Sequence, residues 1–130
     1  MEILKKIDRN LIEYLLGVSV LFFLFVFLVT CTQIGYGVRT RCDAAEGRYG
    51  GECVDALMAQ VADESTDYGK NNAIWALGQL GDKRALPFLE QYVADEEIPD
   101  HESWNEDISQ YELKKAIGFL ENGYNISAFM

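Results

Sequence analysis

Three cysteines, Cys31, Cys42 and Cys53, are the residues whose spacing most directly suggests chemistry. Cys42 and Cys53 bound a glycine-containing segment, CDAAEGRYGGEC, and a disulfide between them would close a short loop. Such a bond would also place this part of the chain in an oxidising compartment. Two unrelated free thiols are the alternative interpretation. We expect no metal site, because nearby residues do not complete a set of four ligands.

Cys31 ends the tetrapeptide Leu28-Val29-Thr30-Cys31, which resembles the cleavage box of a bacterial lipoprotein signal. Thr30 stands where such signals usually have Gly, Ala or Ser, and the preceding apolar run is longer than the apolar region of a signal peptide. The sequence therefore favours an uncleaved anchor. A cleaved chain with a lipid on Cys31 is the alternative.

The other candidates for chemistry lie in one acidic stretch, Asp95 to Glu106, which contains the single histidine, His101. His101 could ligate a metal with Asp100 or Glu102, but no second histidine is present to complete an ordinary zinc site. The acids lack the alternating spacing and central glycine of an EF-hand calcium loop. The sequence also lacks a nucleophile motif and a phosphate-binding glycine loop. We therefore expect a solvated loop, no enzymatic activity, no cofactor and no metal.

Charge is distributed unevenly along the chain. Before Leu15 three acidic and three basic residues cancel, whereas the segment from Thr32 onward has 18 acidic and 8 basic residues and carries the net charge of −10. A surface this acidic does not neutralise nucleic-acid phosphates in the general way. The composition therefore excludes nucleic acid as a general partner and favours proteins or cations.

The elements that must position these residues begin with an apolar run at residues 14–31, YLLGVSVLFFLFVFLVTC. As a helix, these 18 residues would span about 27 Å, close to the thickness of a bilayer's hydrocarbon core. A helix also pairs its own backbone amides, as lipid requires. Tyr14 and Tyr36 lie near the two ends, where aromatic rings prefer the membrane interface. The run therefore predicts a single transmembrane helix.

Three regions follow from this pattern: an N-terminal segment with the anchor at 1–34, a Cys-flanked linker at 35–51, and a helical module at 52–130. Basic residues flank both sides of the anchor and do not decide its orientation. The candidate disulfide favours a cytoplasmic N-terminus and a periplasmic or other extracytoplasmic module. We interpret the chain as a single-pass protein of a bacterial inner membrane.

Apolar residues repeat with helical periodicity through the module and predict an all-α fold. The expected inward-facing residues are Val54, Leu57, Met58, Val61, Ala73, Leu77, Leu80, Leu86, Leu89, Val93, Leu113, Ala116, Ile117 and Leu120. Asp67, Asp82 and either Asp107 or Ser109 are the expected N-caps. Gly81 and Asp82 allow only a very short connection between the second and third helices, which predicts an antiparallel hairpin.

Residues 72–89, NAIWALGQLGDKRALPFL, resemble a HEAT-like repeat of the type first noticed in phycobilisome lyases. The shared features are a helix of small residues, Leu-Gly, Gly-Asp and then Ala-Leu-Pro. Small Ala73, Ala76 and Gly78 would let paired helices approach closely. The resemblance implies a helical-hairpin scaffold, and the flanking helices look like degenerate half-repeats. It does not imply lyase activity, which needs a longer array of repeats.

Stacked repeats bury a continuous core only when neighbours cover each face, and this chain has one clear repeat. We therefore expect a protein partner, such as a larger membrane complex. The leading interpretation is a non-catalytic, membrane-anchored scaffold or accessory subunit. The alternative is a free-standing envelope lipoprotein that binds a peptide or cation. The expected partner-binding residues are Trp75, Gln79, Phe88, Tyr92 and Trp104, with packing between helices as the alternative for Trp75 and core-lid packing for Trp104.

Overall fold

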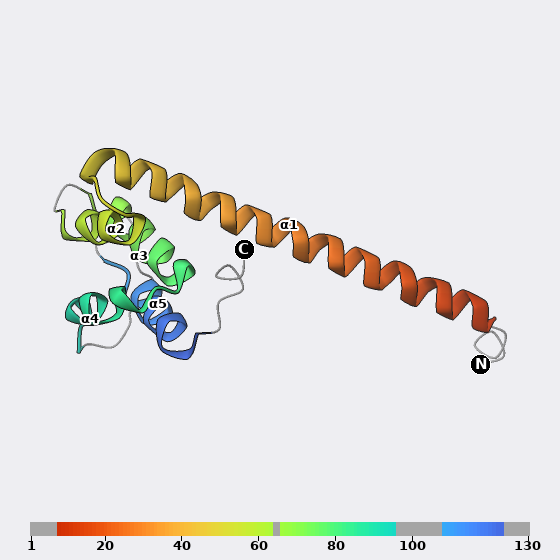
Figure 1. The fold of residues 1–130 in the computed structure, drawn as a ribbon. Helices are drawn as coiled ribbons and strands as arrows, with labels where there is room; N and C mark the ends of the chain where they lie inside the picture. The colour runs from red at the N-terminus through yellow and green to blue at the C-terminus, as the bar shows by residue number, and fades with distance from the viewer. Residues whose placement is uncertain (1–7, 64–65, 96–107, 124–130) are drawn as a thin grey trace. The chain divides into compact units, whose positions relative to one another are not determined.

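The computed structural model describes residues 8–63, 66–95 and 108–123, and their regular secondary structure consists of helices alone (Figure 1). This confirms the all-α fold class. The helices are α1 (Arg9–Tyr49), α2 (Cys53–Ala62), α3 (Asp67–Leu80), α4 (Leu86–Leu89) and α5 (Gln110–Asn122), with short 3₁₀ helices η2 (Lys83–Ala85) and η3 (Glu90–Tyr92) on either side of α4. The expected cap Asp107, His101 and the apolar C-terminal tail lie outside the described residues.

The chain divides into two compact units, Met1–Gln33 and Ile34–Met130, each of which is described here by itself. In the first unit, every residue of α1 from Leu11 to Thr30 is exposed. The most apolar 18-residue window of α1 has a mean hydropathy of 2.6, so α1 is long and apolar enough to cross a membrane. The Thr30 hydroxyl donates to the Val26 carbonyl oxygen at 2.9 Å, which satisfies this polar group within the helix. By length and composition, α1 is thus a candidate membrane span.

Most of the expected Cys-flanked linker at 35–51 is helical, because α1 continues to Tyr49. Only Gly50, Gly51 and Glu52 separate α1 from α2, and the two glycines have φ of +75° and +82°. The loop expected between Cys42 and Cys53 is therefore limited to these three residues. The helix continues to Tyr49 because its face bearing Val38, Cys42, Ala45 and Tyr49 packs on the module's core, which outweighs the weak helix propensity of glycine.

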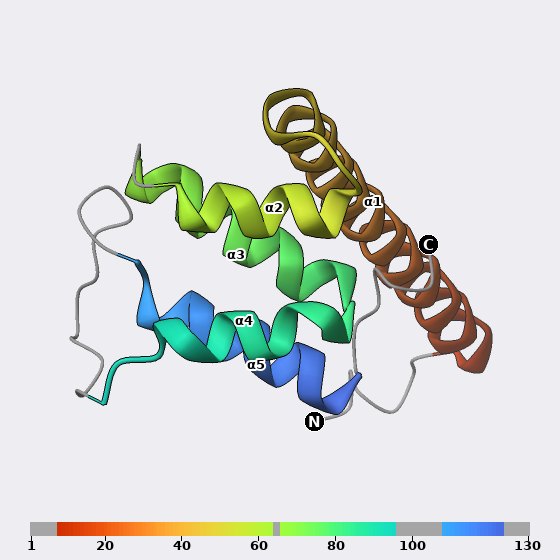
Figure 2. The same ribbon diagram turned by 60° about the vertical axis from the view of Figure 1, so that its left-hand side comes forward.

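In the second unit α3 lies between α2 and α5, and α4 packs along α5 (Figure 2). Most of the expected inward-facing residues are buried in one core. Met58, Leu80, Leu86 and Ile117 are partly buried at its edge. The expectation for Val93 is wrong: its side chain is exposed because helical structure stops at Tyr92. The fully buried core residues with less than 2% exposure are Ala45, Ala56, Leu57, Val61, Ala73, Ile74, Ala76, Leu77, Ala85, Leu89, Leu113 and Leu120.

The closest helix contact lies at Gly78 of α3. A Cβ atom added there would stand 2.8 Å from both Cα and Cβ of Ala116 in α5. The sequence predicted a close approach at Gly78, but between the two successive helices of the repeat. The structure instead places α5, and not α4, against this glycine. Gly78 is therefore the residue that sets the spacing of α3 and α5.

Capping residues end the helices largely where the sequence predicted. Gly81 and Gly123 end α3 and α5 with left-handed backbones, at φ of 68° and 66°. Asp82 accepts a hydrogen bond from the Arg84 amide, and Ser109 accepts one from the Glu112 amide. The exception is α3, whose N-cap is Thr66, one residue before the expected Asp67. The Thr66 hydroxyl accepts a hydrogen bond from the Gly69 amide, so Thr66 caps α3 and Asp67 is its first helical residue.

We predict that Gly78→Ala destabilises the module although alanine favours helices. The added methyl group would clash with the backbone of Ala116, at a cost of about 1–3 kcal/mol for overpacking, against about 1 kcal/mol gained in helix propensity. Urea unfolding of the full chain in detergent, followed by tryptophan fluorescence, measures the change. Gly118→Ala is the control: a Cβ there meets nothing within 4 Å, so this variant should be as stable as the parent or more so. Equal stabilities for the two variants would contradict the close approach.

Candidate interaction surface

A contact centred on Arg41 joins the last turns of α1 to α3. The Arg41 guanidinium donates to the Asn72 side-chain oxygen at 2.9 and 3.3 Å and to the Gly37 carbonyl oxygen at 3.1 Å. Its Cζ atom lies 4.6 Å from the centre of the Trp75 ring, within cation–π range. A Cβ at Gly37 would stand 3.4 Å from the same ring. Trp75 is therefore partly covered by α1, as the helix-packing alternative expected.

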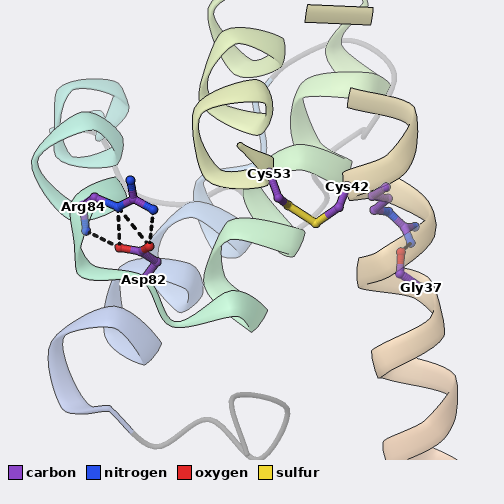
Figure 3. Close-up of a disulfide and its surroundings, with 6 residues drawn as sticks. Gly37, Cys42, Cys53, Asp82 and Arg84 are labelled. Carbon is purple, nitrogen blue, oxygen red and sulfur yellow. Dashed lines mark hydrogen bonds and ion pairs between the residues drawn. A yellow bond between two sulfur atoms is a disulfide. The ribbon is translucent and has the colours of Figure 1, made fainter. Parts of the chain in front are cut away.

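The sulfur atoms of Cys42 and Cys53 form a disulfide, which links α1 to the first residue of α2 (Figure 3). Their Cα atoms are 4.9 Å apart, and the ring closes over 11 positions of sequence. Most of that ring is the end of α1 rather than a loop. Cys31 is a free cysteine within α1. Among the residues that the structure describes, no group of three His, Cys, Asp or Glu side chains is placed to hold a metal ion.

The carboxylate of Asp63, at the end of α2, contacts two side chains from the end of α1. The Tyr49 hydroxyl donates a hydrogen bond to the Asp63 carboxylate, and Arg48 lies 3.3 Å from the same oxygen. The hydrogen bond to Asp63, followed by desolvation, raises the pKa of Tyr49 above its usual value. The end of α1 is thus attached to both ends of α2: Cys42 is bonded to Cys53, and Tyr49 donates to Asp63.

Arg84 connects the start of α2 to the turn between α3 and η2. Its guanidinium donates to both carboxylate oxygens of Asp82, the shortest contact being 2.8 Å (Figure 3). It also donates to Glu52 at 3.2 Å. Hydrogen bonds from the side chain and amide of Arg84 lower the pKa of Asp82. The hydrogen bond of Arg84 to Asp82, followed by its hydrogen bond to Glu52, raises the pKa of Arg84. This cluster fixes the Gly-Asp turn of the repeat and is structural in character.

Asn71 is a functional position that the sequence analysis missed. Its side chain is fully buried, and its oxygen accepts a hydrogen bond from the Ser109 amide at 2.7 Å. Because Ser109 caps α5, Asn71 fixes the start of α5 against α3. The available signal was its position: Asn71 stands three residues before Ile74 on the apolar face of α3. A polar residue on such a face needs a buried partner.

The expected partner-binding residues do not form one cluster. Phe88 and Tyr92 contact each other, with ring centres 5.3 Å apart and an angle of 57° between their planes, and both are partly exposed. Gln79 is partly buried on α3. Trp75 lies against Arg41 and Gly37 of α1, and Trp104 lies outside the described residues. The aromatic pair on α4 and η3 is half-buried and packs against the core, as Trp75 does. It is the part of the predicted surface whose members contact each other.

Comparison with known families identifies one segment of the chain. The family model for the PBS lyase HEAT-like repeat matches residues 70–95, which run from α3 through the Gly-Asp turn to the end of η3. This confirms the HEAT-like repeat predicted from residues 72–89. No curated protein and no solved structure matches the chain. The protein therefore contains a single matched repeat, in the middle of a longer helical chain.

We predict that the purified chain has one reactive thiol without reductant and three after reduction and unfolding. Cys42 and Cys53 should be protected by the disulfide, and Cys31 should react once the chain is unfolded. Intact mass after alkylation counts the thiols. Replacing both Cys42 and Cys53 by serine should lower the free energy of unfolding by about 3 kcal/mol, whereas Cys31→Ser should leave it unchanged.

Three alkylated thiols without reductant would contradict the disulfide. The same mass spectrum also tests the processing of the chain. Loss of residues 1–30 together with a lipid on Cys31 would identify the alternative, a cleaved lipoprotein.

We predict that the stability of the module depends on the ionisation of Asp82. Because its folded pKa is lower than the ordinary value of 3.8, the charged form stabilises the fold above that pH, and this contribution is lost as the pH falls through the folded pKa. Asp82→Asn keeps an N-capping side chain but has no charge. The variant should therefore lose less unfolding free energy than the parent between neutral pH and pH below 3.8. Parallel losses in the two proteins would contradict this role.

Proposed function

We propose that this protein is a non-catalytic scaffold or accessory subunit, anchored in a membrane by residues 14–31, which binds a protein partner at the membrane surface. The partner is a larger membrane complex in which this chain is a small subunit. The proposal has two parts, a membrane anchor and a protein-binding module. A separate set of residues supports each part.

The observation that carries the anchor is the exposed apolar helix. Large apolar side chains between Leu11 and Val29 are 42–71% exposed in α1. Full burial of one such side chain is worth about 1.5–3 kcal/mol, so leaving the whole set in water is strongly unfavourable. Lipid supplies the missing apolar environment, and the helix meets its backbone hydrogen-bonding requirement.

The disulfide supports an extracytoplasmic location for the module. Disulfides persist in oxidising compartments and are rare in the reducing cytosol. The bond between Cys42 and Cys53 therefore favours a topology with the N-terminus of α1 on the cytoplasmic side. A bacterial inner membrane, with the module in the periplasm, is the setting we propose.

The matched HEAT-like repeat supports a role in protein binding, since such repeats serve as stacked scaffolds with extended binding surfaces. The Phe88–Tyr92 pair is the part of the repeat that we assign to the partner, because aromatic residues are enriched at interfaces. The exposed side chains of Pro87, Gln91 and Val93 surround it. An acidic module favours a partner surface that carries basic residues around an apolar centre.

A photo-crosslinking residue at position 91, in native membranes washed with alkaline carbonate, tests both parts. Gln91 is exposed and neighbours Tyr92, so this variant should remain in the washed membranes and give a discrete adduct with a protein of the same membrane. The matched control carries the same photoreactive residue at Glu121, which is exposed on α5. It should stay in the membrane and give no such adduct.

Release of the chain by the carbonate wash would refute the anchor. Adducts of equal yield from positions 91 and 121 would refute the assigned binding face. A discrete adduct from position 121 alone would move the interface to α5.

A further inference from the structure

The last turns of α1 have two different faces. One face, with Val38, Cys42 and Ala45, packs on the module. The opposite face is exposed and begins with Tyr36, whose side chain is 72% exposed, and Arg39 one turn later. Residues three apart are neighbours on a helix surface. Tyr36 and Arg39 therefore occupy neighbouring positions on the exposed face, without a contact between the ring and the guanidinium.

Arg39 differs from the other described arginines in having no partner in the structure. Arg41, two residues later, is held by Asn72, Gly37 and Trp75. Arg48 pairs with Asp63 at 3.3 Å and Arg84 with Asp82. Before the apolar run, Arg9 pairs with Glu13 at 3.7 Å. No hydrogen bond, ion pair or ring contact joins Arg39 to another residue of the described chain, so its five N–H donors are available.

The order of residues along α1 fits the layers of a membrane surface. In sequence, Tyr36 follows the expected span, residues 14–31, by five residues and Arg39 by eight. A tyrosine ring favours the headgroup layer of a bilayer, and a long arginine side chain can extend back towards that layer from a position further along the helix. Asp43, the next acidic residue on this exposed face, follows Arg39 by four residues.

We propose that Tyr36 and Arg39 form a binding site for phospholipid headgroups, in which the Arg39 guanidinium donates hydrogen bonds to the lipid phosphate. A guanidinium suits phosphate because two parallel N–H groups match two phosphate oxygens. The site rests on the proposed membrane anchor. The positive charge of Arg39 would offset part of the repulsion between the acidic module and the lipid phosphate groups.

Solid-state NMR of the full chain in phosphatidylcholine vesicles tests this contact. With ¹³C at the arginine guanidinium carbons, dipolar dephasing by lipid ³¹P reports those within a few ångströms of phosphate. Arg39→Lys removes one of the five labelled carbons and keeps the charge and the helix, and Arg39→Gln also removes the charge. Both variants should lose the dephased signal of Arg39. Arg48→Gln, the matched control further along the same helix, should keep it.

The outcomes separate this inference from the proposed function. If the parent chain fails to associate with the vesicles, the anchor is refuted and the headgroup site with it. If the variants associate and show the same dephasing as the parent, the headgroup site alone is overturned. Equal losses in the Arg39 and Arg48 variants would likewise overturn it, because the contact would not be specific to position 39.

Discussion

The spacing between α3 and α5 is the constraint on which the helical module depends. At Gly78 the two helices are so close that even a methyl group would meet the backbone of Ala116. The buried hydrogen bond from the Ser109 amide to Asn71 fixes the same pair of helices near the start of α5. One contact sets the distance and the other sets the register. The apolar side chains of α2 and α4 then complete a single core around α3 and α5.

The end of α1 completes this core on the side of α2 and α3. A single HEAT-like repeat lacks neighbours on its faces, and the sequence suggested that another protein supplies them. In the structure, Ala45 is a fully buried member of the core, and Val38 is buried as well. The disulfide and the contacts of Arg41 and Tyr49 hold this segment in place. This segment therefore covers one side of the core from within the same chain.

Periodicity predicted the helices of the module, and Gly81 and Gly123 correctly marked the ends of α3 and α5. It failed at Val93, which follows the last helical turn, and at residues 42–49, where the sequence suggested a glycine-containing loop. The helix there is stabilised by long-range packing of Val38, Cys42 and Ala45. These residues are spaced at helical intervals, but the glycines among them weaken the periodic pattern in the sequence. Local propensity carries no information about such tertiary contacts.

The candidate interaction surface was less predictable than the fold. The sequence grouped Trp75 with Phe88 and Tyr92 because all three are aromatic and belong to one repeat. In the structure Trp75 lies against Arg41, which is 34 positions earlier and has no local pattern connecting it to that ring. Asn71 was overlooked for a similar reason, since its partner Ser109 lies 38 positions away.

The position of the disulfide has a consequence for the integrity of the chain. The exposed Gly50 and Gly51 lie inside the covalent ring that Cys42 and Cys53 close. A protease that cleaves this turn would cut the polypeptide once but leave both fragments joined through the disulfide. A nicked protein would keep its helical module tethered to its hydrophobic segment until a reductant separates the two pieces.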